Sequence, residues 1–355
     1  MDDEACMRRA LELARRGQRT CTPNPMVGCV IAKDGEVVAE GWHAKAGGPH
    51  AEAVALEQAG AAAAGATVYV TLEPCAHQGR TPPCTAALAA ARPARLVAAA
   101  RDPNPQVDGQ GLAALQEAGI ACEEGLLADD ARALNRGFFQ RMEKGRPWVT
   151  LKTAMTLDGR SALADGASKW LTGPAARRRV HEMRAASCAV LTGCGTALAD
   201  DPLLTARDVD APRQPRRFLL DAELRSAGKG LRLLEDELVI ATAKPRPADL
   251  PAHVELLDVE LADGKADLAA LLRAMAARWE INELLLECGA RLAGAFVKAD
   301  LVDEIKLFVA PKYLGAGLAS CDFAGVAKIA DAPGYRFAGV ELIEDDALLS
   351  MERAA

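Results

Sequence analysis

Four residues in the first quarter of the chain have the types and spacing to hold a metal ion and to use it. His50 and Glu52 are separated by one residue, and Cys75 and Cys84 each follow a proline. One imidazole and two thiolates can bind zinc and leave the fourth position to water, as a catalytic zinc requires. Zinc lowers the pKa of that water towards ~7. We expect Glu52 to act as general base and acid, taking a proton from the water and returning it to a ring nitrogen and a departing amine.

The order of these residues is typical of hydrolytic nucleobase deaminases, whose signature is His-x-Glu followed by Pro-Cys and a second Cys. The two cysteines are nine residues apart here, instead of the usual three. Two alternatives stay open. The cysteines could be buried core thiols with His50 capping a helix, or the zinc could be purely structural, although a structural zinc usually has four protein ligands and needs no glutamate.

The elements around these residues must bring them together. Pro82-Pro83 before Cys84 suits the first turn of a helix, and His50 stands where another helix begins. Helix dipoles at such junctions help to keep thiols deprotonated. Apolar spacing predicts helices at residues 4–16, 50–60, 83–91, 110–118 and 129–142, strands at 67–71, 95–100 and 120–123, and a hairpin of 26–32 with 37–43. Strands that alternate with helices predict a layered α/β domain in which one portion of the sheet is largely parallel.

A polar segment at residues 143–147 contains a Gly and a Pro and predicts a domain boundary, which gives domains 1–144 and 145–355. A second α/β series follows it. Its predicted strands are residues 148–154, 189–192, 217–220, 238–241, 254–257, 283–286 and 304–309, and its predicted helices are 174–184, 268–278 and 290–298.

Composition limits the class of protein. At ~150 residues per domain, 355 residues predict about two domains, and 50% hydrophobic content excludes a disordered chain. The net charge of −7 argues against a general nucleic-acid binder. Ten dispersed cysteines do not form a disulfide framework, and neither a signal peptide nor a run of ~18 apolar residues is present. We therefore expect a cytoplasmic protein that acts on a small molecule, not on a nucleic acid or a membrane.

Several longer stretches resemble one family. In the first half these are residues 22–28, 43, 49–52 and 71–84, the last of which reads TLEPCAHQGRTPPC. In the second half they are residues 151–160, 168–173, 191–196, 199–207 and 287–295, including the run ADDPLLTAR. Over nearly the whole chain they resemble the RibD family, the bifunctional deaminase-reductases of riboflavin biosynthesis.

The resemblance implies a fold, two activities and two cofactors. Residues 1–144 would form a cytidine-deaminase-like three-layer α/β/α domain that hydrolytically deaminates 2,5-diamino-6-(5-phosphoribosylamino)pyrimidin-4-one with one zinc ion per chain. Residues 145–355 would form a dihydrofolate-reductase-like α/β domain that reduces the ribosyl group of 5-amino-6-(5-phosphoribosylamino)uracil to ribityl with NADPH. Family members associate through the reductase domain, so a homo-oligomer is expected.

The resemblance also implies the site residues. Those expected to shape the pyrimidine pocket are Asn24, His43, His77 and Arg80. Those expected to contact NADPH are Ala154, Trp170, Thr196, Asp200, Ala222, Gly289, Ala290, Arg291, Leu292, Ala293, Gly294 and Ala295. Those expected to contact the reductase substrate are Ser168, Arg184, Leu204, Arg207 and Glu287. Lys152 is a further candidate, for assisting protonation.

Physical reasons support part of this assignment and leave alternatives for the rest. Gly289 and Gly294 flank a strand-to-helix turn where backbone N–H groups can approach a pyrophosphate, although tight packing explains such glycines equally well. Guanidinium groups offer paired donors to a phosphate, whereas the alternative for Arg184 and Arg207 is a solvated helix face. The alternative for Asn24 is turn formation within Pro-Asn-Pro.

Two positions depart from the family's usual residues, and two other functions stay open. Thr156 stands where Ser is common, and Ala222 lacks a hydroxyl that is often found there. The first other function is a tRNA or free-base deaminase with an accessory domain. The second is a zinc-stabilised nucleotide sensor without turnover, which the presence of Glu52 disfavours.

Overall fold

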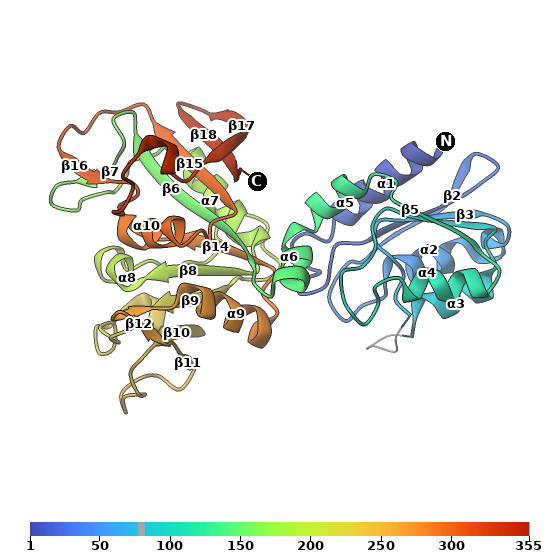
Figure 1. Ribbon diagram of the computed structural model, residues 1–355, viewed down its shortest axis with the longest axis horizontal. Helices are drawn as coiled ribbons and strands as arrows, with labels where there is room; N and C mark the ends of the chain where they lie inside the picture. The colour runs from blue at the N-terminus through green and yellow to red at the C-terminus, as the bar shows by residue number, and fades with distance from the viewer. Residues whose placement is uncertain (77–81, 355) are drawn as a thin grey trace. The chain divides into compact units, whose positions relative to one another are not determined.

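The computed structural model describes residues 1–76 and 82–354, and the chain divides into two compact units, Met1–Lys144 and Gly145–Ala355 (Figure 1). The division falls within the polar segment 143–147. Among the described residues, no helix is long and apolar enough to span a membrane. All ten cysteines lie within the described residues, and all are free thiols.

The first unit contains a five-stranded sheet. Its strands are β1 (Gly28–Lys33), β2 (Glu36–Trp42), β3 (Thr67–Val70), β4 (Arg95–Ala98) and β5 (Ala121–Glu124), in the order β2-β1-β3-β4-β5. β1 is antiparallel to both neighbours, while β3, β4 and β5 are parallel to one another. Asp34 and Gly35, both with positive φ, form the tight turn of the predicted hairpin.

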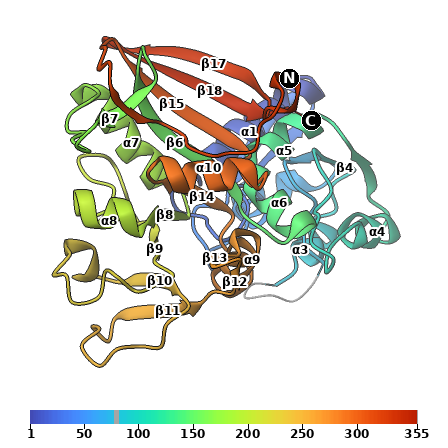
Figure 2. The ribbon, with the colours of Figure 1, turned by 60° about the vertical axis from the view of Figure 1, so that its left-hand side comes forward.

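Helices cover both faces of this sheet, which makes three layers (Figures 1 and 2). The helices are α1 (Asp3–Arg15), α2 (Ala51–Ala59), α3 (Cys84–Ala91), α4 (Gln110–Glu117), α5 (Ala128–Leu134) and α6 (Arg136–Lys144), with a 3-10 turn at Gly60–Ala63. Since successive strand residues point to opposite faces, Val30 belongs to the core beneath α1, α5 and α6, and Ile31 to the core beneath α2, α3 and α4.

The single helix expected at residues 129–142 is wrong, because the chain interrupts it at Asn135. This residue leaves the helical conformation (φ −107°, ψ 24°) between α5 and α6. Its side-chain oxygen accepts a hydrogen bond from Met26 N at 2.7 Å, and its amide nitrogen donates to Met26 O at 2.8 Å. The partner is 109 residues away in the chain, so helical periodicity gives no sign of the break.

The second unit contains a nine-stranded sheet. Its strands are β6 (Trp148–Thr156), β8 (Ala189–Gly193), β9 (Arg216–Leu220), β10 (Leu238–Thr242), β11 (Val254–Asp258), β14 (Glu283–Glu287), β15 (Glu304–Ala310), β17 (Tyr335–Ile343) and β18 (Asp346–Arg353). The order is β11-β10-β9-β8-β14-β6-β15-β18-β17, parallel from β11 to β15 and antiparallel after it. All seven predicted strands are confirmed, whereas the hairpin of β17 with β18 was missed.

Short elements complete the second unit. Two two-stranded pairs join β7 (Arg160–Leu163) to β16 (Gly317–Ala319) and β12 (Leu261–Ala262) to β13 (Lys265–Ala266). Two 3-10 turns lie at Arg232–Leu234 and Ile329–Asp331. The sequence patterns predicted none of these.

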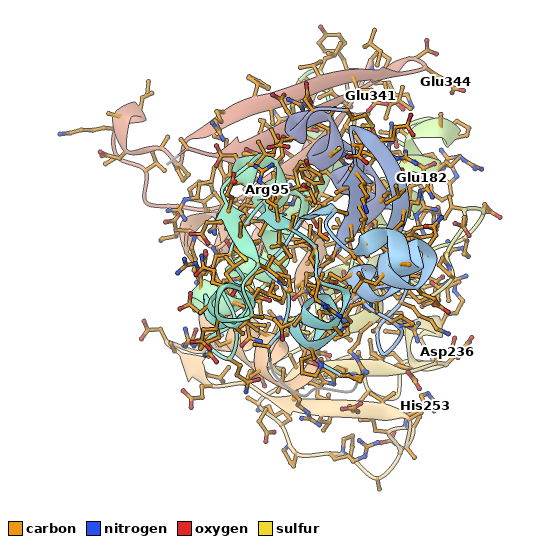
Figure 3. The ribbon with its side chains drawn as sticks, turned by 90° about the vertical axis from the view of Figure 1, so that its right-hand side faces the viewer. Arg95, Glu182, Asp236, His253, Glu341 and Glu344 are labelled. Carbon is orange, nitrogen blue, oxygen red and sulfur yellow. The ribbon has the colours of Figure 1, made fainter. Side chains whose placement is uncertain are left out.

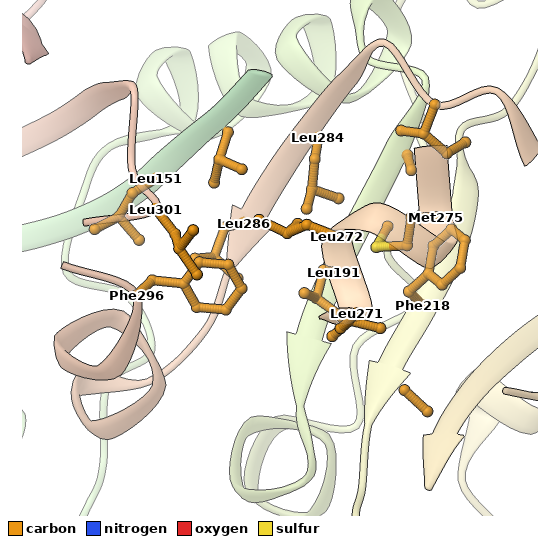
Figure 4. Close-up of a cluster of buried hydrophobic side chains, with 14 of the residues drawn as sticks. Leu151, Leu191, Phe218, Leu271, Leu272, Met275, Leu284, Leu286, Phe296 and Leu301 are labelled. Carbon is orange, nitrogen blue, oxygen red and sulfur yellow. The ribbon is translucent and has the colours of Figure 1, made fainter. Parts of the chain in front are cut away.

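Helices cover both faces of the large sheet as well. They are α7 (Pro174–Ala186), α8 (Cys194–Asp200), α9 (Leu268–Trp279) and α10 (Ala290–Lys298). Leu271 of α9 and Phe296 of α10 pack with Leu191 and Leu286 in one apolar cluster (Figure 4). The alternate strand residues Val190 and Leu285 belong to a second cluster, on the other face. This packing fixes β6, β8 and β14 as neighbouring parallel strands, at whose carboxyl ends α/β proteins usually bind ligands.

Candidate active sites

The structure brings His50, Cys75 and Cys84 together. Their ligand atoms lie within 4.8 Å of one another. His50 Nδ1 is 3.2 Å from Cys84 Sγ and 3.6 Å from Cys75 Sγ. A tetrahedral zinc with bonds of about 2.3 Å to sulfur and about 2.0 Å to nitrogen requires N···S distances of about 3.5 Å, so the donor set and its spacing fit zinc.

Helix beginnings position two of these three residues. His50 immediately precedes α2, and Cys84 is the first residue of α3, as the prolines before it predict. Cys75 lies in irregular chain, five residues beyond the end of β3. The Cys84 N–H donates to Cys75 Sγ at 3.3 Å. The hydrogen bond between the two thiols lowers the pKa of Cys75 and raises that of Cys84, so one of the two thiols ionises readily and the other retains its proton until a metal displaces it.

Glu52 lies in the first turn of α2, beside this group. Its side chain is only 3% exposed. Burial raises the pKa of Glu52, while His50 and Cys84 lower it and Cys75 raises it further. A buried carboxyl group next to a potential metal site matches the position expected of the general acid-base residue.

His43 and Asn24 extend this site. The His43 Nδ1–H donates to Pro49 O at 2.9 Å, so His43 Nε2 is the acceptor for Asn24 Nδ2 at 3.0 Å. The His43 ring meets the His50 ring edge-on, with centroids 5.4 Å apart. Burial lowers the pKa of His43, consistent with a neutral imidazole. The other two predicted pocket residues, His77 and Arg80, lie outside the described residues.

In the second unit, charged residues gather at the carboxyl end of β14 and at the middle of the neighbouring strand β6. Lys152 on β6 is the direct register partner of Glu287 on β14. Glu287 accepts two hydrogen bonds from Arg184 of α7, from Nε at 2.6 Å and from Nη2 at 2.8 Å. Burial opposes ionisation of Glu287, but Arg184 outweighs it and keeps the pKa of Glu287 below its usual range. Burial lowers the pKa of Lys152, while Glu287 opposes that effect.

The turn into α10 lies beside α8. Gly289 precedes α10, and an added Cβ there would lie 3.4 Å from Thr196 Oγ1 of α8. Gly289 has no side chain that could cap α10. The N–H of Leu292 donates to Gly289 O at 3.1 Å, so the N–H groups of Ala290 and Arg291 are the ones that an anion could approach. A glycine is required at position 294 for a different reason, because a Cβ added there would lie 2.0 Å from Asp322 O. Tight packing, the alternative left open by the sequence, therefore explains Gly294.

The remaining predicted residues lie on neighbouring segments. Trp170 is 67% exposed. The guanidinium carbon of Arg177 lies over its ring, 4.5 Å from the ring centroid. Lys169, adjacent to it, donates to Asp200 O at 3.1 Å, which joins the segment that contains Ser168 to the end of α8. Leu204 is buried, and the Arg207 guanidinium donates to Thr205 Oγ1 at 2.7 Å.

Known proteins share both units. Residues 147–349 match the family model described as RibD C-terminal domain, and residues 1–100 match the one described as cytidine and deoxycytidylate deaminase zinc-binding region. The riboflavin biosynthesis protein RibD of Escherichia coli (strain K12) is 45% identical over 366 residues and covers 99% of both chains. The chain belongs to the RibD family.

Two solved structures agree with this assignment. Acinetobacter baumannii RibD is 41% identical, with a TM-score of 0.93 over 99% of both chains. A Thermotoga maritima protein is described as a diaminohydroxyphosphoribosylaminopyrimidine deaminase/5-amino-6-(5-phosphoribosylamino)uracil reductase. It is 37% identical, with a TM-score of 0.88 over 99% of this chain and 98% of that one. The predicted fold class and the predicted bifunctional role in riboflavin biosynthesis are confirmed.

RibD proteins combine a zinc-binding deaminase part with an NADPH-using reductase part, so both predicted cofactors are confirmed. The two departures from the family's usual residues are accommodated differently. The Thr156 hydroxyl donates to Asp158 and accepts from Arg160 N at 3.0 Å, so this hydroxyl serves the turn after β6. Ala222 has no side-chain hydroxyl, and its backbone carbonyl accepts a hydrogen bond from Ala243 N at 3.0 Å.

Sequence reasoning missed Glu73, which supports the zinc ligands. Its buried carboxylate accepts backbone N–H bonds from Gly109 and Gly111 at 2.9 Å, from Leu112 at 3.2 Å and from Asp102 at 3.3 Å. It thereby fixes the chain two residues before Cys75. A carboxylate beside Pro-Cys at the end of an apolar strand is the signal that could have identified it, because a buried charge needs partners.

Proposed function

We propose that residues 1–144 catalyse the deamination and residues 145–355 the reduction. The substrates are 2,5-diamino-6-(5-phosphoribosylamino)pyrimidin-4-one and 5-amino-6-(5-phosphoribosylamino)uracil, the compounds implied by the activities named for the Thermotoga maritima protein. Separate matches of the two family models, to residues 1–100 and 147–349, support the division. The observation that carries the deaminase assignment is the group of His50, Cys75 and Cys84 beside the buried Glu52.

In the deaminase unit, His50, Cys75 and Cys84 hold the zinc ion. Zinc, when bound, supplies Lewis-acid activation of water. Glu52 accepts one proton from the attacking water and gives it to the ring nitrogen; it then takes the proton of the newly added hydroxyl and gives that one to the amine, which leaves as ammonia when the C–N bond breaks. Asn24 and His43 line the pyrimidine pocket, since their mutual hydrogen bond and the bond from His43 to Pro49 O hold the His43 ring against His50.

In the reductase unit, the N-terminus of α10 binds the cofactor pyrophosphate. The proposed NADPH contacts are Ala154, Trp170, Thr196, Asp200, Ala222 and residues 289–295. The proposed substrate contacts are Ser168, Arg184, Leu204, Arg207 and Glu287. The protein aligns the nicotinamide with the anomeric carbon of the opened sugar, where the hydride is delivered. Lys152, the register partner of Glu287, is the candidate for assisting protonation.

Arg207→Ala tests the proposed phosphate contact. Burial, followed by the charge of Arg184, lowers the pKa of Arg207, so a bound anion would relieve the repulsion between the two guanidiniums. Loss of this charge-assisted contact should raise KM for reduction roughly 10-fold to 100-fold, with little change in kcat. The check is steady-state NADPH oxidation with the uracil substrate. Unchanged reductase kinetics would remove Arg207 from the phosphate site.

One coupled assay tests the two proposed functions together. Purified protein with measured zinc content receives the diamino-pyrimidine substrate, and ammonia and NADPH are followed separately. We expect ammonia release without NADPH, and NADPH oxidation only after the deaminated product has formed. A zinc-loaded protein that releases no ammonia and oxidises no NADPH would contradict both assignments.

The protein acts on a small molecule, and we propose that it does so in the cytoplasm without binding nucleic acid. The net charge of −7 supports this, because it repels polyanions. Nucleic-acid affinity that falls steeply with salt would contradict the proposal.

We also propose a homo-oligomer formed through the reductase unit. β17 is the last strand of the large sheet, and Phe337, Val340 and Leu342 on it are 68%, 65% and 78% exposed. Exposed apolar edge strands are typical association sites. Figure 3 shows this hairpin with the side chain of Glu341.

Replacing Val340 and Leu342 together by Lys should convert the assembly to monomers, as measured by light scattering during size-exclusion chromatography. Ile329→Lys is the matched control, since Ile329 is 95% exposed but lies outside β17. A double variant with the mass of the unmodified protein would exclude this strand from the interface.

A further inference from the structure

The segment between α8 and β9 carries two of the residues proposed to bind the reductase substrate. Residues 201–207 have no regular secondary structure, yet they contain Leu204 and Arg207. Leu204 has a φ of +56°, a conformation that residues other than glycine rarely adopt. Its side chain is nevertheless buried. Such a backbone needs partners outside the segment to hold it in one conformation.

Side chains from other elements donate hydrogen bonds to the backbone carbonyl groups on either side of Leu204. Arg217 of β9 is buried and donates from Nη1 to Leu203 O at 3.2 Å. Arg184 of α7 donates from Nη1 to Thr205 O at 3.1 Å. These two contacts fix the chain on either side of Leu204.

Gln214 makes the most specific of these contacts, with Ala206. Its Oε1 accepts from Ala206 N at 2.8 Å, and its Nε2 donates to Ala206 O at 3.0 Å. The orientation of the amide is set by chemistry, because Ala206 N–H requires an acceptor and Ala206 C=O requires a donor. A two-point bond of this kind fixes the peptide planes on both sides of Ala206, and one of them leads directly into Arg207.

The Arg207 backbone is held at the next step as well. Its N–H donates to His181 Nδ1 at 3.2 Å. Gln214 itself is an exposed residue, outside every apolar cluster of the unit. The two hydrogen bonds to Ala206 are therefore the contacts that Gln214 contributes, and replacing Gln214 should leave the apolar core intact.

We infer that Gln214 is a positioning residue for the reductase substrate, which holds the Ala206 backbone so that Arg207 meets the substrate phosphate. This inference rests on the proposed function, in which Arg207 binds that phosphate. Gln214 does not touch the substrate. It acts through the orientation of the peptide that precedes Arg207.

The test compares Gln214→Ala and Gln214→Met with the unmodified full chain, using NADPH oxidation with the uracil substrate. We expect KM to rise roughly fivefold to tenfold in both variants, with kcat within about twofold, because both lose the two hydrogen bonds. Met keeps the bulk of Gln, so a role in packing alone would be rescued by Met. Arg216→Ala is the matched control, since Arg216 is a partly exposed neighbour that pairs with Glu255.

A double variant separates this inference from the proposed function. In an Arg207→Ala background, Gln214→Ala should raise KM no further, since its effect passes through Arg207. Additive effects, or rescue by Met, would overturn the positioning role while leaving the Arg207 contact in place. If Arg207→Ala alone leaves KM unchanged, the proposed phosphate site fails, whatever Gln214 does.

Discussion

Glu52→Gln should abolish ammonia release and leave NADPH oxidation of the deaminated substrate nearly intact. The substitution keeps the shape of the side chain but removes the carboxylate that carries the proton between water, ring and amine. General acid-base catalysis contributes roughly 10²-fold to 10⁴-fold, so the deamination rate should fall by at least that factor. Reduction should continue, because the proposed NADPH and substrate residues all belong to Gly145–Ala355. Separate assays of ammonia and NADPH on one preparation measure both.

Two controls make this result decisive. Zinc content must match that of the unmodified protein, which shows that the proposed metal site is still occupied. Glu57→Gln changes an exposed glutamate on the same helix, α2, and should leave both activities unchanged. If a folded, zinc-replete Glu52→Gln protein lost both activities, the two-site assignment would be wrong.

Local chemistry explains why the positions of His50 and Cys84 at the beginnings of helices could be predicted from sequence. Proline before Cys84 and the start of α2 at His50 are signals contained within a few residues, and the structure has both helices where the signals place them. The position of Cys75 was less predictable. Cys75 follows β3 through irregular chain in which Glu73 bonds to N–H groups 29 to 39 residues further on, and no local pattern encodes that distance.

The missed hairpin has a different physical cause. β17 reads YRFAGVELI, and its alternation of apolar and polar residues is interrupted at Ala338-Gly339, where the register with β18 shifts. Each half is therefore shorter than the roughly four alternating residues that identify a strand. Antiparallel pairing with β18 holds this segment in the strand conformation. The central strands β8 and β14 are buried on both faces and were predicted correctly, because continuous apolar runs are typical of parallel sheets.

The pairing of Arg184 with Glu287 could not be predicted either, since 103 residues separate them. Sequence reasoning expected each to contact the substrate by itself. In the structure their side chains are only 12% and 10% exposed and bond to each other. The pair therefore sets the charge and shape of the proposed substrate site, and its removal should have large effects.

Arg184→Met should lower the free energy of unfolding of the reductase unit by about 3–5 kcal/mol, because it leaves Glu287 buried without its main partner. The double variant Arg184→Met/Glu287→Gln should recover part of that loss, since no unpaired charge remains. Differential scanning calorimetry or urea unfolding measures all three proteins. Arg278→Met is the control: it breaks the pair of Arg278 with Glu255, whose side chains are 52% and 44% exposed, and should cost at most about 1 kcal/mol.

The pH dependence gives an independent check on the same pair. The folded-state pKa of Glu287 lies below its unfolded value, so the pair contributes its full stability above the unfolded carboxyl pKa of about 4.3 and loses it as the pH falls through the lower folded pKa. The difference in unfolding free energy between the unmodified protein and the double variant should therefore be constant near neutral pH and change only in acid. A difference that changed between pH 6 and 8, roughly the range in which histidine titrates, would indicate that another group, and not Glu287, carries the effect.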